Sequence, residues 1–152
     1  MAMTNPFDPR TIFLAKHAQH VVLIHFPIAL FITGVAFDAA ARWTKRQILL
    51  AVADYNLIAA ALVTFPVIAT GLLAWRWALE GQHLKGILLL HLIFGCISSV
   101  LMWIIGWLHL GLLQGRSSFP PGVRLALEVL GVAIVGLTGH LGGFLSGVNG
   151  PG

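Results

Sequence analysis

The chain has 152 residues, of which 58% are hydrophobic and only 9% are charged. A soluble domain carries about 25% charged residues, so this composition excludes an ordinary soluble globule and indicates a surface that mostly faces lipid. The nine Lys and Arg residues, which give a formal net charge of +4, are scattered at the ends of apolar runs and form no patch for a nucleic acid.

Three regions are predicted along the chain. Residues 1–19 form a polar, interfacial lead-in, because they contain no continuous apolar run of the kind that a cleavable signal requires. Residues 20–145 form a domain of four transmembrane helices, and residues 146–152 form a Gly-rich tail.

Four apolar runs reach the ~20 residues that a bilayer-spanning helix needs. They extend from about His20 to Trp43, from Ile48 to Trp77, from Gly86 to Leu113 and from Val123 to Leu145. Their short connections place each helix antiparallel to the next. The predicted fold is therefore all-α, an integral membrane four-helix bundle with up-down-up-down topology.

Two prolines and two aspartates interrupt the apolar runs. Pro27 lies in the first two turns of the first span, where a missing N–H matters least. Pro66 is central in the second span and predicts a kink, with Thr64 or Thr70 re-satisfying the freed backbone groups.

Asp38, near the far end of the first span, is predicted to form a surface-type pair with Arg42 at i, i+4. The alternative is that Asp38 borders a polar pocket together with Asp54.

The histidines are distributed unevenly between the two membrane faces. His25 lies five residues after His20, His91 five residues after Gly86, and His140 five residues before Leu145. Because neighbouring spans are antiparallel, all three are expected about 7 Å inside the same face at ~1.5 Å per residue. His109 is the exception and belongs to the opposite face, 18 residues after His91. Five whole turns separate them, so both should point the same way from the third span.

Histidines from facing helices in a bundle core are common axial ligands of haem. The sequence therefore predicts a b-type haem protein, with His25 and His91 as the axial pair and with His91 and His140 as the second choice. Cationic and imidazole side chains at the same face are expected to pair with the haem propionates. These are His20, His83, Arg76 and Lys85.

Two other functions stay open. A metal site could form if His25, His91 and His140 converged on Zn, Cu or Fe. Alternatively, the chain is a non-catalytic subunit of a larger respiratory or transport complex, with a quinone or lipid at its groove. The glycines beside the histidines fit plain helix packing as well as room for a planar cofactor, and Gly95 and Gly106 are candidates for a homodimer contact.

Several strings resemble the bacterial "domain of unknown function 2231" family of four-helix membrane proteins. The matching strings are His20 with Ile24-His25-Phe26-Pro27-Ile28-Ala29-Leu30, Asp38, Thr70-Gly71-Leu72-Leu73-Ala74-Trp75, His91, and Thr138-Gly139-His140-Leu141-Gly142-Gly143. Two features depart from the family: Val21 replaces the proline that often follows the first histidine, and the distal histidine after the double glycine is absent. The resemblance implies the four-span fold and a bacterial inner membrane. It implies no reaction, although members look similar to proteins that accompany c-type cytochromes.

Topology is predicted from the positive charges near the span ends. The histidine-bearing face carries Arg10, Lys16, Arg76 and Lys85, and the opposite face carries Arg42, Lys45, Arg46, Arg116 and Arg124. The cluster of Arg42, Lys45 and Arg46 favours a cytoplasmic opposite face. The N-terminus would then be periplasmic, and a c-type cytochrome could accept electrons that reach the haem from a quinol or another membrane donor.

Overall fold

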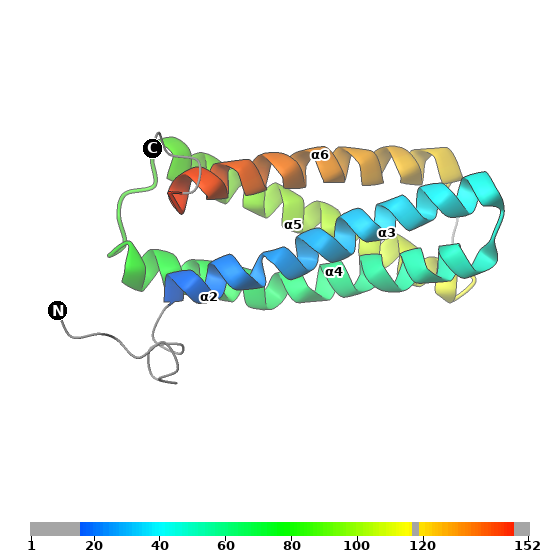
Figure 1. Cartoon of the computed structure of the whole chain (residues 1–152), viewed down its shortest axis with the longest axis horizontal. Coiled ribbons are helices and arrows are strands. Elements are labelled where there is room, and N and C mark those ends of the chain that lie inside the picture. Colours follow the sequence, from blue (N-terminus) through cyan, green and yellow to red (C-terminus); the bar gives the residue numbers. More distant parts are fainter. Residues whose placement is uncertain (1–15, 117–118, 148–152) are drawn as a thin grey trace.

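A computed structural model describes residues 16–116 and 119–147, and they form a helical bundle (Figure 1). The elements are α2 (Lys16–Leu23), α3 (His25–Thr44), α4 (Gln47–Leu73), η1 (Ala74–Ala78), α5 (Gly86–Leu113) and α6 (Pro121–Leu145). Four helices in the described part are long and apolar enough to cross a membrane: Ala18–Thr44, Gln47–Trp77, Gly86–Leu113 and Pro121–Leu145. The predicted all-α, four-span fold is confirmed. Helix α2 begins at Lys16, inside the predicted lead-in. Residues 1–15 of the lead-in and residues 148–152 of the tail lie outside the described residues.

The first span is interrupted once, at Ile24 between α2 and α3. Pro27 has no N–H to give to the carbonyl of Leu23, and α2 ends at that residue. Ile24 keeps helical dihedral angles, and its N–H bonds the carbonyl of His20 at 3.0 Å, so the chain continues in nearly the same direction. The interruption therefore falls immediately before His25.

Helix α4 continues as an α-helix through Pro66 to Leu73. The carbonyl that Pro66 leaves without a helical donor belongs to Leu62. Neither predicted threonine restores that bond: Thr64 Oγ1 donates to the carbonyl of Ala61 at 2.6 Å, and Thr70 Oγ1 donates to that of Pro66 at 2.9 Å. The α-helix ends at Leu73, and the π-helical turn η1 follows, beginning eight residues after Pro66.

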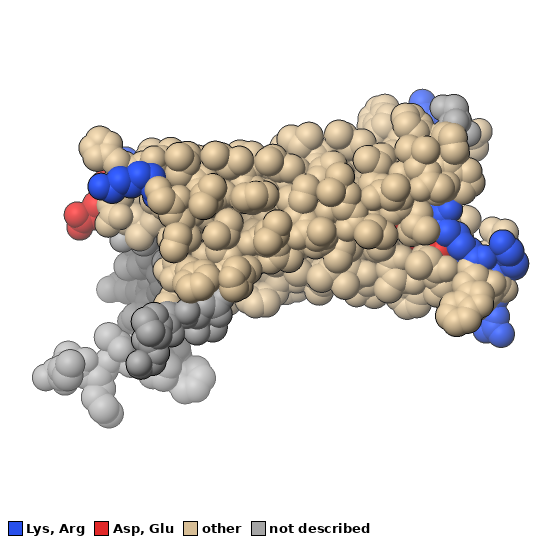
Figure 2. All heavy atoms as spheres, turned by 90° about the horizontal axis from the view of Figure 1, so that it is seen from above, with Lys and Arg blue, Asp and Glu red and all other residues tan. Residues whose placement is uncertain are grey.

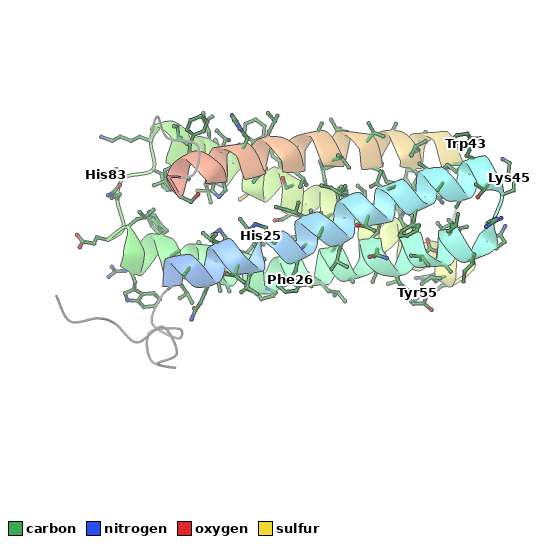
Figure 3. The ribbon with its side chains drawn as sticks, in the orientation of Figure 1. His25, Phe26, Trp43, Lys45, Tyr55 and His83 are labelled. Carbon is green, nitrogen blue, oxygen red and sulfur yellow. The ribbon has the colours of Figure 1, made fainter. Side chains whose placement is uncertain are left out.

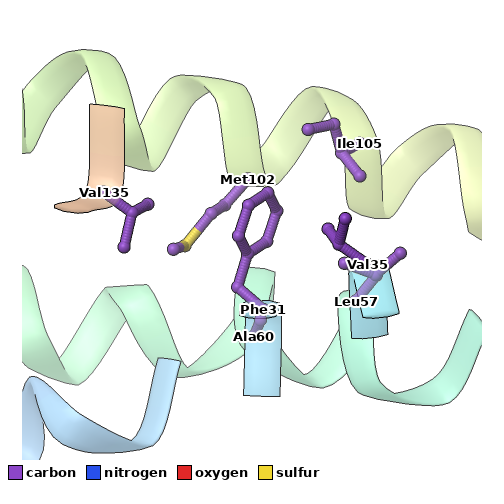
Figure 4. Packing of buried hydrophobic residues seen from close by; sticks show 7 residues of the cluster. All are labelled: Phe31, Val35, Leu57, Ala60, Met102, Ile105 and Val135. Carbon is purple, nitrogen blue, oxygen red and sulfur yellow. The ribbon is translucent and has the colours of Figure 1, made fainter. Parts of the chain in front are cut away.

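The buried core lies at mid-bundle, where all four spans meet. Its cluster consists of Phe31 and Val35 from α3, Leu57 and Ala60 from α4, Met102 and Ile105 from α5, and Val135 from α6 (Figure 4). Outside this core the helices are covered by exposed large apolar side chains such as Leu62, Phe65, Ile104, Val129 and Leu137. Figure 2 shows Lys, Arg, Asp and Glu at the two ends and uncharged side chains between them. This distribution fits a bundle surrounded by lipid.

Three glycines allow the spans to approach closely around the core. A Cβ at Gly34 would lie 2.7 Å from Leu57 Cγ, and one at Gly131 would lie 2.7 Å from Phe31 Cζ. A Cβ at Gly106 would lie 2.7 Å from the Cβ of Ala61. Gly106 is thus buried against α4 within one chain, so it is not free to form the homodimer contact that the sequence left open. The missing side chain of Gly106 allows α4 and α5 to approach closely within the monomer.

We call one end of the bundle the histidine end: it contains the start of α2 and α5 and the end of η1 and α6. There α2 packs against α4 and η1, and α5 packs against α6. In Figure 1 the α2–α4 pair and the α5–α6 pair diverge toward this end. At the other end, all four spans are held together by polar side chains described below.

Gly106→Ala is expected to destabilise the fold by about 1–3 kcal/mol, because the new methyl group meets the Cβ of Ala61, which cannot rotate away. Gly111→Ala in the same helix is the matched control, since nothing lies within 4 Å of its Cβ position. Unfolding of both variants in detergent, followed by circular dichroism, measures the difference. Equal stability of the two variants would contradict this packing.

Candidate functional site

The predicted histidines lie at one end of the molecule. His20 is in α2, His25 begins α3, His91 is in the second turn of α5, and His140 is in the last two turns of α6. Because α3 and α5 start at the end where α6 finishes, all four belong to the histidine end (Figure 1). His83 lies in the loop before α5 at the same end and is exposed (Figure 3).

In three of these rings, Nδ1 forms a hydrogen bond with a backbone carbonyl oxygen. His25 Nδ1 lies 2.7 Å from the carbonyl oxygen of Val21, and His91 Nδ1 lies 3.1 Å from that of Thr138 in α6. His20 Nδ1 lies 3.2 Å from the carbonyl oxygen of Val67 in α4 and 3.3 Å from Thr70 Oγ1. A carbonyl oxygen only accepts, so Nδ1 carries the proton in each case and Nε2 keeps a lone pair.

The rings differ in their surroundings. His91 is half-buried against α6, where a Cβ on Gly142 would lie 3.2 Å from its Cε1. His25 is exposed, and His140 is exposed with its ring edge against Phe144, 5.0 Å between centroids. Within residues 16–116 and 119–147, no three His, Cys, Asp or Glu side chains are grouped to hold a metal ion. The predicted three-histidine metal site therefore has no support here, whereas an axial pair needs only two rings.

The two cations expected beside haem propionates are exposed at the same end. Arg76 lies in η1, and Lys85 immediately precedes α5. They lie at the same end as His83.

A second polar site occupies the opposite end of the bundle, and sequence reasoning missed most of it. Its members come from all four spans: Asp38 and Arg42 in α3, Asp54 in α4, His109 in α5, and Arg124 and Glu128 in α6. We call this set the carboxylate network. Five of its members are buried, with 0% of Asp38, His109 and Glu128 exposed.

His109 is the centre of the network. Its Nδ1 lies 2.6 Å from Asp54 Oδ1, and its Nε2 lies 2.9 Å from Glu128 Oε1. The ring thus joins α4, α5 and α6. As expected from their spacing, His91 and His109 point the same way, since both bond α6.

Two arginines complete the network. Arg42 binds Asp38 Oδ2 through Nε at 2.6 Å and through Nη2 at 2.5 Å. Arg124 lies 3.7 Å from Asp38 Oδ1 and 3.7 Å from Glu128 Oε1. The predicted Asp38–Arg42 pair is confirmed, but its surface character is wrong, because Asp38 is fully buried and also faces Arg124.

The geometry requires one more proton than the ordinary charge states supply. A neutral imidazole has one N–H and can donate to only one of Asp54 and Glu128, which leaves a lone pair against a carboxylate oxygen. The charges give the same answer: three carboxylates and two guanidinium groups leave −1 in a low-dielectric interior. An imidazolium at His109, or one protonated carboxyl group beside it, satisfies both conditions.

One sequence signal could have revealed this site. Three of the five acidic residues, Asp38, Asp54 and Glu128, lie inside predicted spans. Charged side chains within a membrane face the bundle interior and pair with one another. His109 and Arg124 are the partners at the same depth, and Glu128 follows Arg124 at i+4.

Comparison with known proteins gives one match. A family model described as "Predicted membrane protein (DUF2231)" matches residues 16–150. Neither a curated protein nor a solved structure matches the chain.

The first prediction for the network concerns its extra proton. In protein labelled with ¹⁵N at histidine, one imidazole is expected to have two protonated nitrogens at a pH where free imidazole is neutral, and its signal should be missing from His109→Gln. A protonated-carboxyl infrared band that is lost in Glu128→Gln would place the same proton on the acid. Neutral imidazoles throughout, with no such band, would contradict the proton count.

The second prediction concerns Arg124. Arg124→Gln removes the cation between Asp38 and Glu128 and is expected to cost about 3–5 kcal/mol of unfolding free energy, because it leaves buried carboxylates uncompensated. Arg116→Gln removes the same charge from an exposed side chain outside the network and is expected to leave stability nearly unchanged. Denaturant titrations in detergent compare the two; similar losses would contradict the burial argument.

Proposed function

The chain belongs to the DUF2231 family of predicted membrane proteins, and we propose that it is a membrane-embedded b-type haem protein with His25 and His91 as axial ligands. One observation carries the proposal. Both rings donate Nδ1–H to a backbone carbonyl, and the described residues give Nε2 of neither ring a partner. A metal-ligating histidine is held in this way, with its second nitrogen bonded to a carbonyl and Nε2 left for the metal.

The exposure of His25 supports the same conclusion. His25 lies inside the span Ala18–Thr44, yet its side chain is exposed. A polar ring facing hydrocarbon is costly unless a partner covers it. In Figure 3, His25 is drawn on the edge of α3 nearer α6, and Phe26 on the opposite edge. A cofactor bound at the histidine end would cover the ring.

Helix α6 leaves space for such a group. Nothing lies within 4 Å of a Cβ at Gly136 or Gly139, which precede His140. These glycines differ from Gly34, Gly106 and Gly131, whose missing Cβ atoms are needed for helix packing. Room beside the backbone at the histidine end suits a planar macrocycle better than a closely packed interface.

The remaining residues would orient the cofactor rather than ligate it. His83, Arg76 and Lys85 are exposed at the end where haem propionates would leave the membrane, and cations bind carboxylates well there. His20 is bonded to α4 and packs near Gly71, which suits a positioning role. His140 is the alternative partner of His91.

Bound haem would supply reversible one-electron transfer. We infer a path from a membrane donor such as a quinol to a c-type cytochrome at the histidine end, in a bacterial inner membrane with this end periplasmic. Members of the family look similar to proteins that accompany c-type cytochromes, which supports a c-type cytochrome as the electron acceptor.

The test is the visible spectrum of protein purified after expression with added haem precursor. We expect a reduced-minus-oxidised spectrum of a six-coordinate haem b. His25→Ala and His91→Ala should each abolish or shift the bands, because an axial ligand is lost. Phe26→Ala, which truncates the exposed neighbour of His25, should leave them unchanged.

Three outcomes would overturn or amend the proposal. No Soret band after haem supplementation would end it, and a stoichiometric partner without a chromophore would favour the non-catalytic subunit. Loss of the bands in His140→Ala but not in His25→Ala would move the axial pair to His91 and His140.

A further inference from the structure

A pocket opens at the end of the bundle that holds the carboxylate network, which we call the carboxylate end and which lies opposite the histidine end. Its volume is about 230 Å³, and it lies between the end of α3, the start of α4 and the start of α6. It is lined by Asp38, Ala41, Arg42, Lys45, Arg46, Gln47, Leu50, Pro121 and Arg124. Four of these nine residues are cations and one is an anion, so the lining is strongly basic.

The charges are not all available to a ligand. Arg42 is held by Asp38 at 2.5 Å and donates through Nη1 to the carbonyl of Pro121 at 2.8 Å. This pair is neutral as a unit. Lys45 and Arg46, in the turn between α3 and α4, are exposed and have no carboxylate partner among the described residues. Figure 2 shows blue side chains of this end around a small area of red.

Arg124 is the residue that points to a missing ligand. It is only 6% exposed, and both of its nearest carboxylate oxygens are 3.7 Å away, beyond hydrogen-bond distance. Its Nε is buried without a hydrogen-bond partner among the described residues, as is Oδ1 of Asp38. A buried guanidinium group without hydrogen bonds is costly. A group with several acceptor oxygens, placed in the pocket, would accept hydrogen bonds from Arg124 and relieve that cost, whereas Asp38 Oδ1 is itself an acceptor and still depends on Arg124, 3.7 Å away.

The position of the pocket narrows the chemistry of this group. It lies where α3 ends and where α4 and α6 begin, at the level of lipid headgroups for helices of this length. Gln47 and Pro121, the first residues of α4 and α6, both line it, so the positive ends of two helix dipoles face the same space. Arginine forks and helix N-termini both favour tetrahedral phosphate oxygens.

The net charge is compatible with one phosphodiester. With neutral His109, the carboxylate network carries −1, and Lys45 and Arg46 bring the network and the pocket lining together to +1; Arg116, which does not line the pocket, is outside this count. A singly charged phosphate diester would balance it. If His109 is protonated, the balance moves further toward anion binding.

We propose that the pocket bordered by Arg124, Lys45 and Arg46 binds a phosphate group, supplied by the headgroup of an anionic phospholipid or by free phosphate. Basic pockets between membrane helices bind such headgroups elsewhere. The site is independent of the haem proposed at the other end.

The experiment uses the full chain in maltoside micelles and phosphate-free buffer. One arm titrates inorganic phosphate, and the other titrates phosphatidylglycerol against phosphatidylcholine. The thermal unfolding midpoint and lipid adducts in native mass spectrometry are the readouts. We expect a saturable rise in the midpoint and retained phosphatidylglycerol, with the affinity reduced about tenfold or more in the double variant Lys45→Asn/Arg46→Gln.

The variants were chosen to separate binding from folding. Lys45 and Arg46 are exposed and stand outside the carboxylate network, and asparagine tolerates the positive φ of 60° at Lys45. Arg116→Gln, an exposed arginine at the same end that does not line the pocket, is the control and should bind like the wild type.

Each outcome decides the proposal or its source. Saturable stabilisation by phosphatidylglycerol alone identifies the lipid headgroup, and stabilisation by inorganic phosphate identifies the free anion. No saturable effect of either probe would overturn the proposal. An equal loss in Arg116→Gln would also overturn it, because it would indicate general surface charge.

Discussion

The need to neutralise charge inside the membrane governs one half of this molecule. Hydrocarbon cannot solvate the carboxylates of Asp38, Asp54 and Glu128, so each must find a cation or a donor within the bundle. They come from three different spans, and His109 from the remaining one joins two of them. Breaking such a network is expensive even where its net contribution to stability is small. The network therefore fixes which faces of the four helices meet.

Small residues govern the middle of the bundle. Gly34, Gly106 and Gly131 allow Leu57, Ala61 and Phe31 to occupy space that a Cβ would take. In lipid, where no hydrophobic force draws helices together, close packing supplies much of the association. Toward the histidine end the helix pairs diverge in Figure 1, and Gly136 and Gly139 of α6 have no atom within 4 Å of a Cβ position, whereas Gly142 lies against His91. One helix thus uses glycine for packing at Gly131 and leaves space at Gly136 and Gly139.

The two ends of the bundle have different chemistry. At the histidine end, His20, His25 and His91 hydrogen-bond backbone carbonyls, and we propose that Nε2 of His25 and His91 binds a cofactor. At the carboxylate end, side chains bond to one another, and the unsatisfied atoms of Asp38 and Arg124 border a basic pocket. The electron-transfer role that we propose belongs to the first end, and the proposed phosphate site to the second. Mid-bundle apolar residues such as Phe31 and Leu57 separate them.

The sequence by itself determined the number of spans, their limits within a few residues and the common end of His25, His91 and His140. Length, hydropathy and alternating direction are sufficient for that, because they depend on the chain order and the bilayer thickness alone. It also predicted the Asp38–Arg42 ion pair, because the two residues lie four positions apart in one helix. Only the tertiary structure decided that Asp38 is buried, that His109 lies between Asp54 and Glu128, and that Gly106 packs within the monomer. Those facts depend on the rotation of each helix about its axis, which the packing of all four helices sets and no single span encodes.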